Sequence, residues 1–171
     1  APDGEVEDYL VRITGPDITH NKSIVSVTQT SANNYSVVYQ IEVTNSSLGI
    51  GSYGLDDVPN FDDDITILSS NYSSTAPGNP GGVLAGSGPW TLATNQTIAG
   101  NTTHVYTLTV DVNINLAATS GGDNNYTACA ETTTGNPISG EGLFNESVLD
   151  IFDDGTVDER DTACADLPYI I

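Results

Sequence analysis

Two ten-residue stretches of alternating side chains constrain this chain more than any other feature. In residues 35–44 and 106–115, every second side chain is apolar and most of the others are polar. A period of two places the apolar side chains on one face of an extended strand. The pattern predicts half-buried antiparallel strands at the centre of two packed sheets. The apolar members are Tyr35, Val37, Tyr39, Ile41, Val43, Tyr106, Leu108, Val110, Val112 and Ile114.

Shorter strand-like runs, separated by turn residues, extend this pattern along the chain. We expect further strands at 23–30, 64–69, 90–93, 126–131, 143–152 and 165–171, with turns at 31–34, 51–54, 76–89, 120–125 and 153–155. Together, these strands and turns predict an all-β fold. We expect an immunoglobulin-like antiparallel β-sandwich over residues 15–171, preceded by a strand arm at 1–14. The Cys–Trp–Cys order of antibody domains is absent, because Trp90 precedes both cysteines.

The charge balance excludes several classes of partner. Three Lys and Arg residues stand against 23 Asp and Glu, for a formal net charge of -20. Binding to a nucleic-acid backbone or to anionic lipid needs basic patches that this chain lacks. No apolar run approaches the length of a membrane span. Because only 15% of the residues are charged and the apolar ones alternate, we expect a folded domain.

Cys129 and Cys164 are the only cysteines and would close a loop of about 35 residues. The loop-entropy model gives a disulfide there about 4 kcal/mol of stabilisation. A disulfide predicts an oxidising compartment, and hence an extracellular or cell-surface location. Two unpaired buried thiols are the alternative. A zinc site is not expected, because His20 and His104 lie far away in the sequence.

Several segments resemble a known family when they are taken in order. They are YSVVYQIEVTNSS, YGLDDVPNFDDDITI, HVYTLTVDVNI, GLFNESV and TACADLP. Together they resemble the Ig-like conserved-repeat modules of large secreted adhesins and surface proteins of bacteria. The leading DGEVEDYLVRI resembles the closing strand of a GEVED-type module. The resemblance implies an extracellular structural module without catalytic activity, and it implies no particular ligand.

The N-terminal segment reads as a lone strand that is set apart by a Gly-Pro break at 15–16. Its apolar residues are Val6, Tyr9, Leu10, Val11 and Ile13. The arm could fold back as an edge strand of its own domain, or be processed or disordered. Alternatively, it could complete a sheet of a neighbouring copy, with main-chain hydrogen bonds for affinity. Such a heterologous contact propagates into an open filament, so we expect copies of this chain as partners. The apolar tail at 169–171 is the other candidate donor.

Eight Asn-X-Ser/Thr sequons occur, which exceeds the number expected from composition. They are Asn21, Asn34, Asn45, Asn71, Asn95, Asn101, Asn125 and Asn145. Most are expected at turns or strand ends, where an acceptor for an N-linked glycan must lie. The alternative is that Asn-rich turns beside Thr-rich strands create the motif by composition alone.

Two acidic clusters are candidate calcium sites, and no other cofactor is expected. Asp150, Asp153, Asp154, Asp158 and Asp161 follow part of a calcium-loop pattern, but Phe152 stands at a ligand position and no helix is expected before it. The second cluster comprises Asp56, Asp57, Asp62, Asp63 and Asp64. Solvated acidic turns are the alternative for both clusters.

Enzymatic motifs are missing from the sequence, so no catalytic residue is predicted. A carbohydrate-binding module would need an exposed aromatic platform, for which Trp90, Tyr53 and Tyr72 are the candidates. We expect the structural subunit of an extracellular, glycosylated filament, assembled by strand exchange. The alternative is a monomeric adhesin or carbohydrate-binding module.

Overall fold

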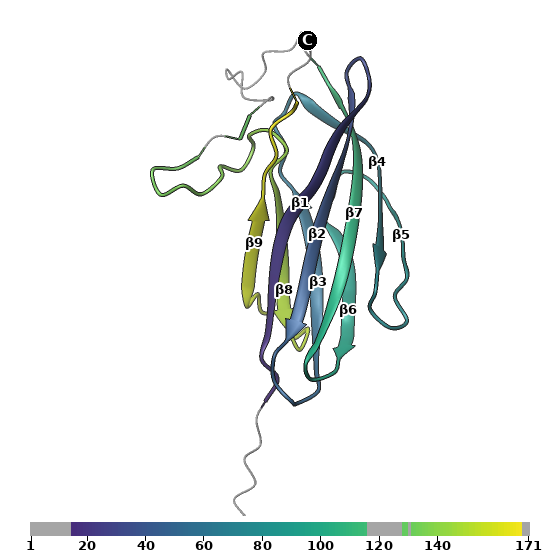
Figure 1. Ribbon diagram of the computed structural model, residues 1–171, viewed down its shortest axis with the longest axis vertical. Coiled ribbons are helices and arrows are strands. Elements are labelled where there is room, and N and C mark those ends of the chain that lie inside the picture. Colours follow the sequence, from purple (N-terminus) through teal and green to yellow (C-terminus); the bar gives the residue numbers. More distant parts are fainter. Residues whose placement is uncertain (1–14, 116–127, 130, 169–171) are drawn as a thin grey trace, which may run out of the picture.

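The protein is a β-sandwich of two antiparallel sheets packed face to face (Figure 1). The computed structural model describes residues 15–115, 128–129 and 131–168. One sheet has five strands, in the order β1 (Ile18–Ser31), β2 (Asn34–Asn45), β7 (Thr102–Ile114), β4 (Ile65–Ser74) and β5 (Gly81–Leu84). The other has four, in the order β6 (Trp90–Ile98), β3 (Gly51–Pro59), β8 (Asn145–Ile151) and β9 (Glu159–Ala163). The predicted all-β sandwich is therefore confirmed.

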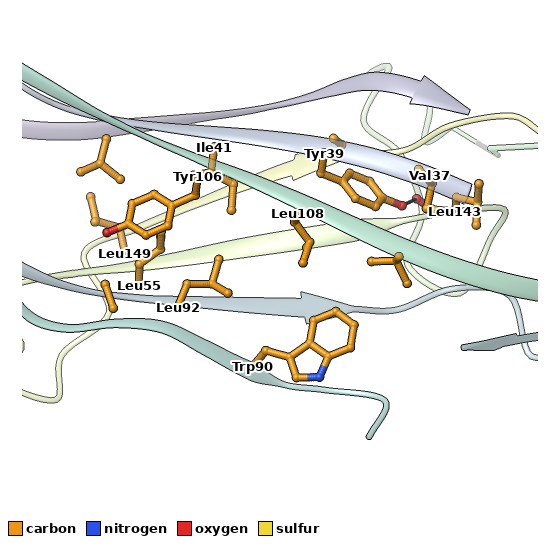
Figure 2. Close-up of a cluster of buried hydrophobic side chains, with 14 of the residues drawn as sticks. Val37, Tyr39, Ile41, Leu55, Trp90, Leu92, Tyr106, Leu108, Leu143 and Leu149 are labelled. Atoms are coloured by element: carbon orange, nitrogen blue, oxygen red, sulfur yellow. Dashed lines mark hydrogen bonds between the residues drawn. The ribbon is translucent and has the colours of Figure 1, made fainter. Parts of the chain in front are cut away.

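The two stretches with strict alternation become β2 and β7, which lie side by side in the middle of the five-stranded sheet. Their apolar side chains point between the sheets, where Tyr39, Ile41 and Leu108 are fully buried (Figure 2). From the opposite sheet, Leu55, Leu92 and Leu149 complete the core. The hydroxyl of Tyr39 donates to the backbone oxygen of Leu143 at 2.7 Å, so this buried phenol keeps a partner.

Strand β3 was not predicted, because its first residues read as a turn. Gly51 and Gly54 lie inside the strand, and their role is close packing. A Cβ on Gly51 would lie 2.7 Å from the Cβ of Pro16, and one on Gly54 would lie 2.6 Å from Oδ1 of Asp153. The prediction of a turn at 51–54 is therefore wrong, and a central strand of the second sheet begins there.

Other boundaries also differ from the prediction. Strand β1 begins five residues earlier than expected, and β5 lies within the long predicted turn at 76–89. The last strand of the second sheet is β9, and residues 165–168 are not in a strand. Of the predicted strand at 126–131, the structure describes residues 128–129 and 131, and none of these lies in a strand of either sheet. Glu131 forms an isolated bridge with Pro137.

The described part of the chain enters and leaves the sandwich at opposite ends of its long axis (Figure 1). At the entry, the backbone N–H of Ser46 donates to the oxygen of Asp17 at 2.9 Å. Near the exit, Cys129 and Cys164 form the predicted disulfide, with an S–S distance of 1.99 Å. The arm at 1–14 lies outside the described residues. Among the described residues, no helix is long and apolar enough to cross a membrane.

Candidate functional site

Polar and ionisable side chains gather in the interior where β1 faces β3, β8 and β9. The buried members are His20, Lys22, Asp57, Asn145 and Ser147. They come from both sheets, because β1 belongs to the first and the other three strands to the second. Burial of so many polar groups costs free energy unless they interact with one another. We refer to these five residues as the polar cluster.

An ion pair between Lys22 and Asp57 is the centre of the polar cluster. The Nζ of Lys22 donates a hydrogen bond to Oδ2 of Asp57, and neither side chain is exposed to solvent. The ammonium group also lies 5.1 Å from the ring centroid of Tyr39, which adds a cation–π contact. Burial lowers the pKa of Lys22, and the nearby Asp57 carboxylate only partly offsets that effect. Burial likewise raises the pKa of Asp57, which the Lys22 charge opposes.

Alternation in both strands explains how these two side chains enter the core. In β1, Ile18, His20 and Lys22 are buried while the residues between them are exposed. In β3, Asp57 follows Tyr53 and Leu55 on the inward face. Since Lys22 is the only lysine in the chain, its position on an inward face is the signal that sequence analysis missed. Asp57 was predicted to join an acidic calcium cluster and is instead the partner of Lys22.

Asn145 lies in β8 beside Asp57 and is fully buried. Its amide is close enough to Asp57 to favour the ionised carboxylate through a hydrogen bond, which lowers the pKa of Asp57. Neither the Oδ1 nor the Nδ2 atom of Asn145 completes a hydrogen bond of good geometry, and Oδ1 of Asp57 also has none. Buried polar atoms without such a bond are rare in folded proteins and call for an explanation.

His20 and the edge strand β9 close this flank of the sandwich. The Nε2 of His20 lies 2.9 Å from Oγ of Ser147, and its Nδ1 lies 3.3 Å from Oε1 of Glu159. The backbone N–H of Lys22 donates to Oδ2 of Asp161 at 2.6 Å, and that of His20 donates to Glu159 at 3.4 Å. Burial lowers the pKa of His20, although the Glu159 charge opposes this. Carboxylates of β9 therefore accept hydrogen bonds from the outward backbone N–H groups at the start of β1.

A second buried polar group, at the other end of β3, consists of Tyr53, His104 and Tyr106. The hydroxyl of Tyr53 lies 2.8 Å from Nδ1 of His104 and 2.7 Å from the hydroxyl of Tyr106. The rings of Tyr72 and Tyr106 stack with centroids 6.3 Å apart. Burial lowers the pKa of His104 and raises the pKa values of Tyr53 and Tyr106, so these three groups stay neutral near neutral pH. They form a satisfied neutral network.

The structure places the predicted sugar platform inside the protein. Trp90 and Tyr53 are buried, and Tyr72 is half-buried against Tyr106. The indole N–H of Trp90 donates to the oxygen of Ala85 at 3.0 Å, which fits a core residue. These three aromatic residues cannot present an open stacking surface to a sugar.

Of the two predicted calcium clusters, the structure gathers ligand atoms only in part of the second. Within the described residues, Asp62, Asp63 and Asp64 are the only group of three or more potential ligands, with ligand atoms within 4.8 Å of one another. Oδ1 of Asp62 accepts a hydrogen bond from the N–H of Asp64 at 2.9 Å. Clustered carboxylate oxygens of this kind suit a hard cation such as calcium. Asp56 and Asp57 do not join them.

Three carboxylates of the other predicted calcium cluster bond the backbone of their own loop, and the other two bond residues of other strands. Asp150 accepts from the N–H groups of Asp154 and Gly155, and Asp158 accepts from Ile151. Asp153 bonds Asn95, while Asp161 bonds Lys22. Among the described residues, these five carboxylates form no metal-binding group. Strand β9 begins at Glu159 and carries Asp161 away from the loop, and calcium binding by these residues stays a prediction.

The sequons divide into exposed and buried sites. Asn21, Asn71, Asn95 and Asn101 are exposed, and Asn34 is half-buried; Asn125 lies outside the described residues. Asn45 and Asn145 are fully buried. The Nδ2 of Asn45 donates to the oxygen of Gly49 at 2.7 Å. A sugar needs Nδ2 at the surface, so the prediction of acceptors at Asn45 and Asn145 does not fit the folded domain.

Comparison with known proteins adds no identity to this geometry. No protein-family model matches the chain, and no curated protein matches it. The resemblance to conserved-repeat modules therefore stays a prediction, and function has to be argued from the molecule itself.

Proposed function

We propose that this protein is a structural subunit of an extracellular filament, in which residues 1–14 of one copy add a strand to the next copy. One observation carries the proposal: the part of β1 beyond Lys22 is an edge strand that no described strand covers. β1 pairs with β2 on one side only, and it is the outermost strand of its sheet. Open strand edges pair readily with another chain.

The open part of β1, residues 23–31, is well suited to receive an arm. Ile24 and Val27 pack partly against the core, while Val25 is 56% exposed. The segment has nine residues, a length similar to the predicted arm strand. Strand addition would satisfy its outward backbone groups, with side-chain pockets that set the register.

Contacts at the start of β1 favour pairing between copies over a hairpin within one copy. An arm that folded back after Gly15 would first meet the residues next to the turn. There the outward N–H groups of His20 and Lys22 are already bonded to Glu159 and Asp161 of β9. The edge strand β6 offers less, because Tyr72 and Asn79 already donate hydrogen bonds to the backbone oxygen of its Leu92.

The position of the chain ends supports a linear assembly. The described part of the chain enters and leaves the sandwich at opposite ends of its long axis (Figure 1), so an arm that leaves at the entry could reach a copy stacked below. A contact of this kind is heterologous and continues without closing. The disulfide fits an oxidising, extracellular setting, and Asn21, Asn71, Asn95 and Asn101 supply exposed positions for a glycan coat.

Electron microscopy of the full chain and of a chain lacking residues 1–14 tests the assembly. We expect filaments from the first and monomers from the second. The truncated chain should bind a synthetic peptide of residues 1–14, and a scrambled peptide is the matched control. Hydrogen exchange at residues 23–31 should slow on binding, because their outward N–H groups gain partners.

Each outcome has a defined meaning for this proposal. Filaments from both chains would reject the arm as the junction. Monomers from both would reject the filament and favour the monomeric adhesin. Peptide binding that protects β5 or β6 would keep strand addition but move the receiving edge away from β1.

A further inference from the structure

Apolar side chains are exposed at the end of the sandwich where the described chain enters. Leu48 and Ile50, in the loop from β2 to β3, are 84% and 71% exposed. Of the large apolar side chains that the structure describes, only Val83 is more exposed than Leu48. Phe152 is also exposed and lies beside the start of β3, where its N–H donates to the oxygen of Ser52 at 2.8 Å. Neighbouring apolar side chains at one end of a domain indicate an interaction surface.

The loop that carries Leu48 is held in one shape by the buried side chain of Asn45. Its Oδ1 accepts from the N–H of Ser47 at 3.2 Å and from the hydroxyl of Ser47 at 2.9 Å. Its Nδ2 donates to the oxygen of Gly49 at 2.7 Å. The turn from β6 to β7 packs against the loop, because a Cβ on Gly100 would lie 2.5 Å from the backbone oxygen of Leu48. A loop that is ordered in advance loses little conformational entropy when it binds.

The same loop holds the root of the N-terminal arm. The hydroxyl of Ser46 donates to Oδ2 of Asp17 at 2.6 Å, and the N–H of Asp17 donates to Oδ1 of Asn45 at 3.2 Å. Leu48 therefore stands beside the point at which the arm leaves the sandwich. Any copy that receives the arm is brought close to this loop.

A cavity of about 380 Å³ lies at the opposite end of the sandwich. Strand β3 runs from the loop of Leu48 to this cavity, and the first residue of β4, Ile65, pairs there with Ile114 at the end of β7. The lining includes a group of apolar side chains from the end of β3, the next loop and the start of β4: Pro59, Phe61, Ile65 and Ile67. Leu48 and an apolar cavity thus lie at the two ends that stacked copies would bring together.

Charge opposes this contact, so apolar burial has to supply the attraction. Asp17 and Asp153 lie at the entry end, and Asp62 and Asp63 line the cavity at the other end. The whole chain has a formal net charge of -20. Copies of such a chain repel each other, and dissolved salt screens that repulsion.

We propose that Leu48 of one copy inserts into the cavity at Phe61 and Ile67 of the next copy, as a second contact beside the added strand. The inference rests on the proposed function, because it requires copies that are stacked end to end. A Cβ on Gly15 would have no atom within 4 Å, so packing does not fix the direction of the arm at that residue. The inserted leucine fixes the angle and distance between successive subunits.

The substitution Leu48→Ser tests the contact in the full chain. The chains would be made in a host without N-glycosylation, because Asn101 is a sequon whose N–H bonds Ser47 and a sugar there would cover the loop. We expect the critical concentration for filament formation to rise roughly tenfold or more, the effect of losing one buried leucine side chain. Stability in urea should not change, because the side chain is exposed in the single domain.

Two controls separate this contact from the arm. Val83→Ser removes an apolar side chain that is 88% exposed on β5, and it should leave the critical concentration unchanged. A Leu48→Ser chain that lacks residues 1–14 should bind the peptide of residues 1–14 as tightly as the truncated wild-type chain does. Filaments of the wild-type chain should form more readily as sodium chloride is raised, because salt screens the repulsion between copies.

Cross-linking tests which surface receives Leu48. In a chain with both Leu48→Cys and Asp63→Cys, the second position is exposed at the cavity. Mild oxidation of its filaments should give a ladder of covalent oligomers on a non-reducing gel, with residues 48 and 63 joined in mass spectra of the fragments. The control carries Val83→Cys and Asp63→Cys and should stay monomeric on the gel.

The opposite results overturn the proposal. Leu48→Ser filaments at the wild-type critical concentration would reject the contact and leave the arm junction intact. Filaments that form without residues 1–14 but are lost in Leu48→Ser would keep the contact and reject the arm. A missing ladder, or an equal ladder from the control, would reject the cavity as the receiving surface. Assembly that weakens with salt would show a junction held by charge, and monomers of the wild-type chain would reject both the arm and the contact.

Discussion

The core contains two polar groups at different positions along β3, and they differ in how well they are satisfied. Around Tyr53, two hydroxyl groups and an imidazole form hydrogen bonds of 2.7 and 2.8 Å and stay neutral. Around Asp57, two ionisable groups and a carboxamide meet, and three of their polar atoms lack good hydrogen bonds. A network in which every polar atom is hydrogen-bonded stiffens a core. Buried polar atoms without a hydrogen bond are rare and call for an explanation.

The largest expected effect is that of removing the acid from the polar cluster. Asp57→Ala leaves Lys22 buried without its partner, so we expect the free energy of unfolding to fall by about 3–5 kcal/mol. Urea denaturation measures this change. The double variant Lys22→Met/Asp57→Leu removes both charges and should recover much of the loss. A double variant as unstable as Asp57→Ala would contradict this account.

A substitution in the neutral network of Tyr53, His104 and Tyr106 should lower the free energy of unfolding by a smaller amount. Tyr53→Phe removes the hydroxyl that bonds both His104 and Tyr106, and we expect a loss of about 1–3 kcal/mol because buried partners are left unpaired. Tyr35→Phe is the control, because Tyr35 is buried in the same sandwich but no hydrogen bond to its hydroxyl is found within the described residues. Equal effects of the two substitutions in urea denaturation would show that the network contributes nothing specific.

The smallest expected effect concerns pH. Burial lowers the pKa of His104 from its ordinary value of 6.5, so the unfolded chain binds this proton first as the pH falls. The resulting stability is fully present above pH 6.5 and is lost as the pH falls below it. We therefore expect the difference in unfolding free energy between about pH 7.5 and about pH 5.5 to be smaller in His104→Gln than in wild type. An unchanged difference would show that His104 titrates normally.

The same comparison shows what the sequence could and could not predict. The central strands of the sandwich could be predicted from the alternation of apolar and polar side chains. Tyr39, Ile41 and Leu108 lie on the apolar face of that pattern and are buried in the core. The polar cluster was missed because Lys22 and Asp57 carry residue types that usually mark the surface. Because Gly51 and Gly54 are typical turn residues, strand β3 was not predicted. The inward position of Asp57 in that strand could therefore not be recognised.

The acidic and asparagine-rich motifs were harder to interpret. Carboxylates in turns can hold a metal ion or bond the loop backbone, and only the fold shows that Asp150 and Asp158 do the latter. Similarly, a sequon records three residue types and not their exposure. The burial of Asn45 and Asn145 depends on neighbours that are distant in the sequence, such as Asp17 for Asn45, whose Oδ1 accepts from the Asp17 N–H at 3.2 Å.

The entry and exit of the described chain at opposite ends of the sandwich has a mechanical consequence. A force that pulls these ends apart runs along β1, parallel to the strand. Antiparallel hydrogen bonds are perpendicular to their strands, so the whole β1–β2 ladder is sheared at once and is not unzipped one bond at a time. The register from Ile18 to Ser31 spreads that load over the length of the domain. We expect the sandwich to yield to tension only in a single concerted rupture.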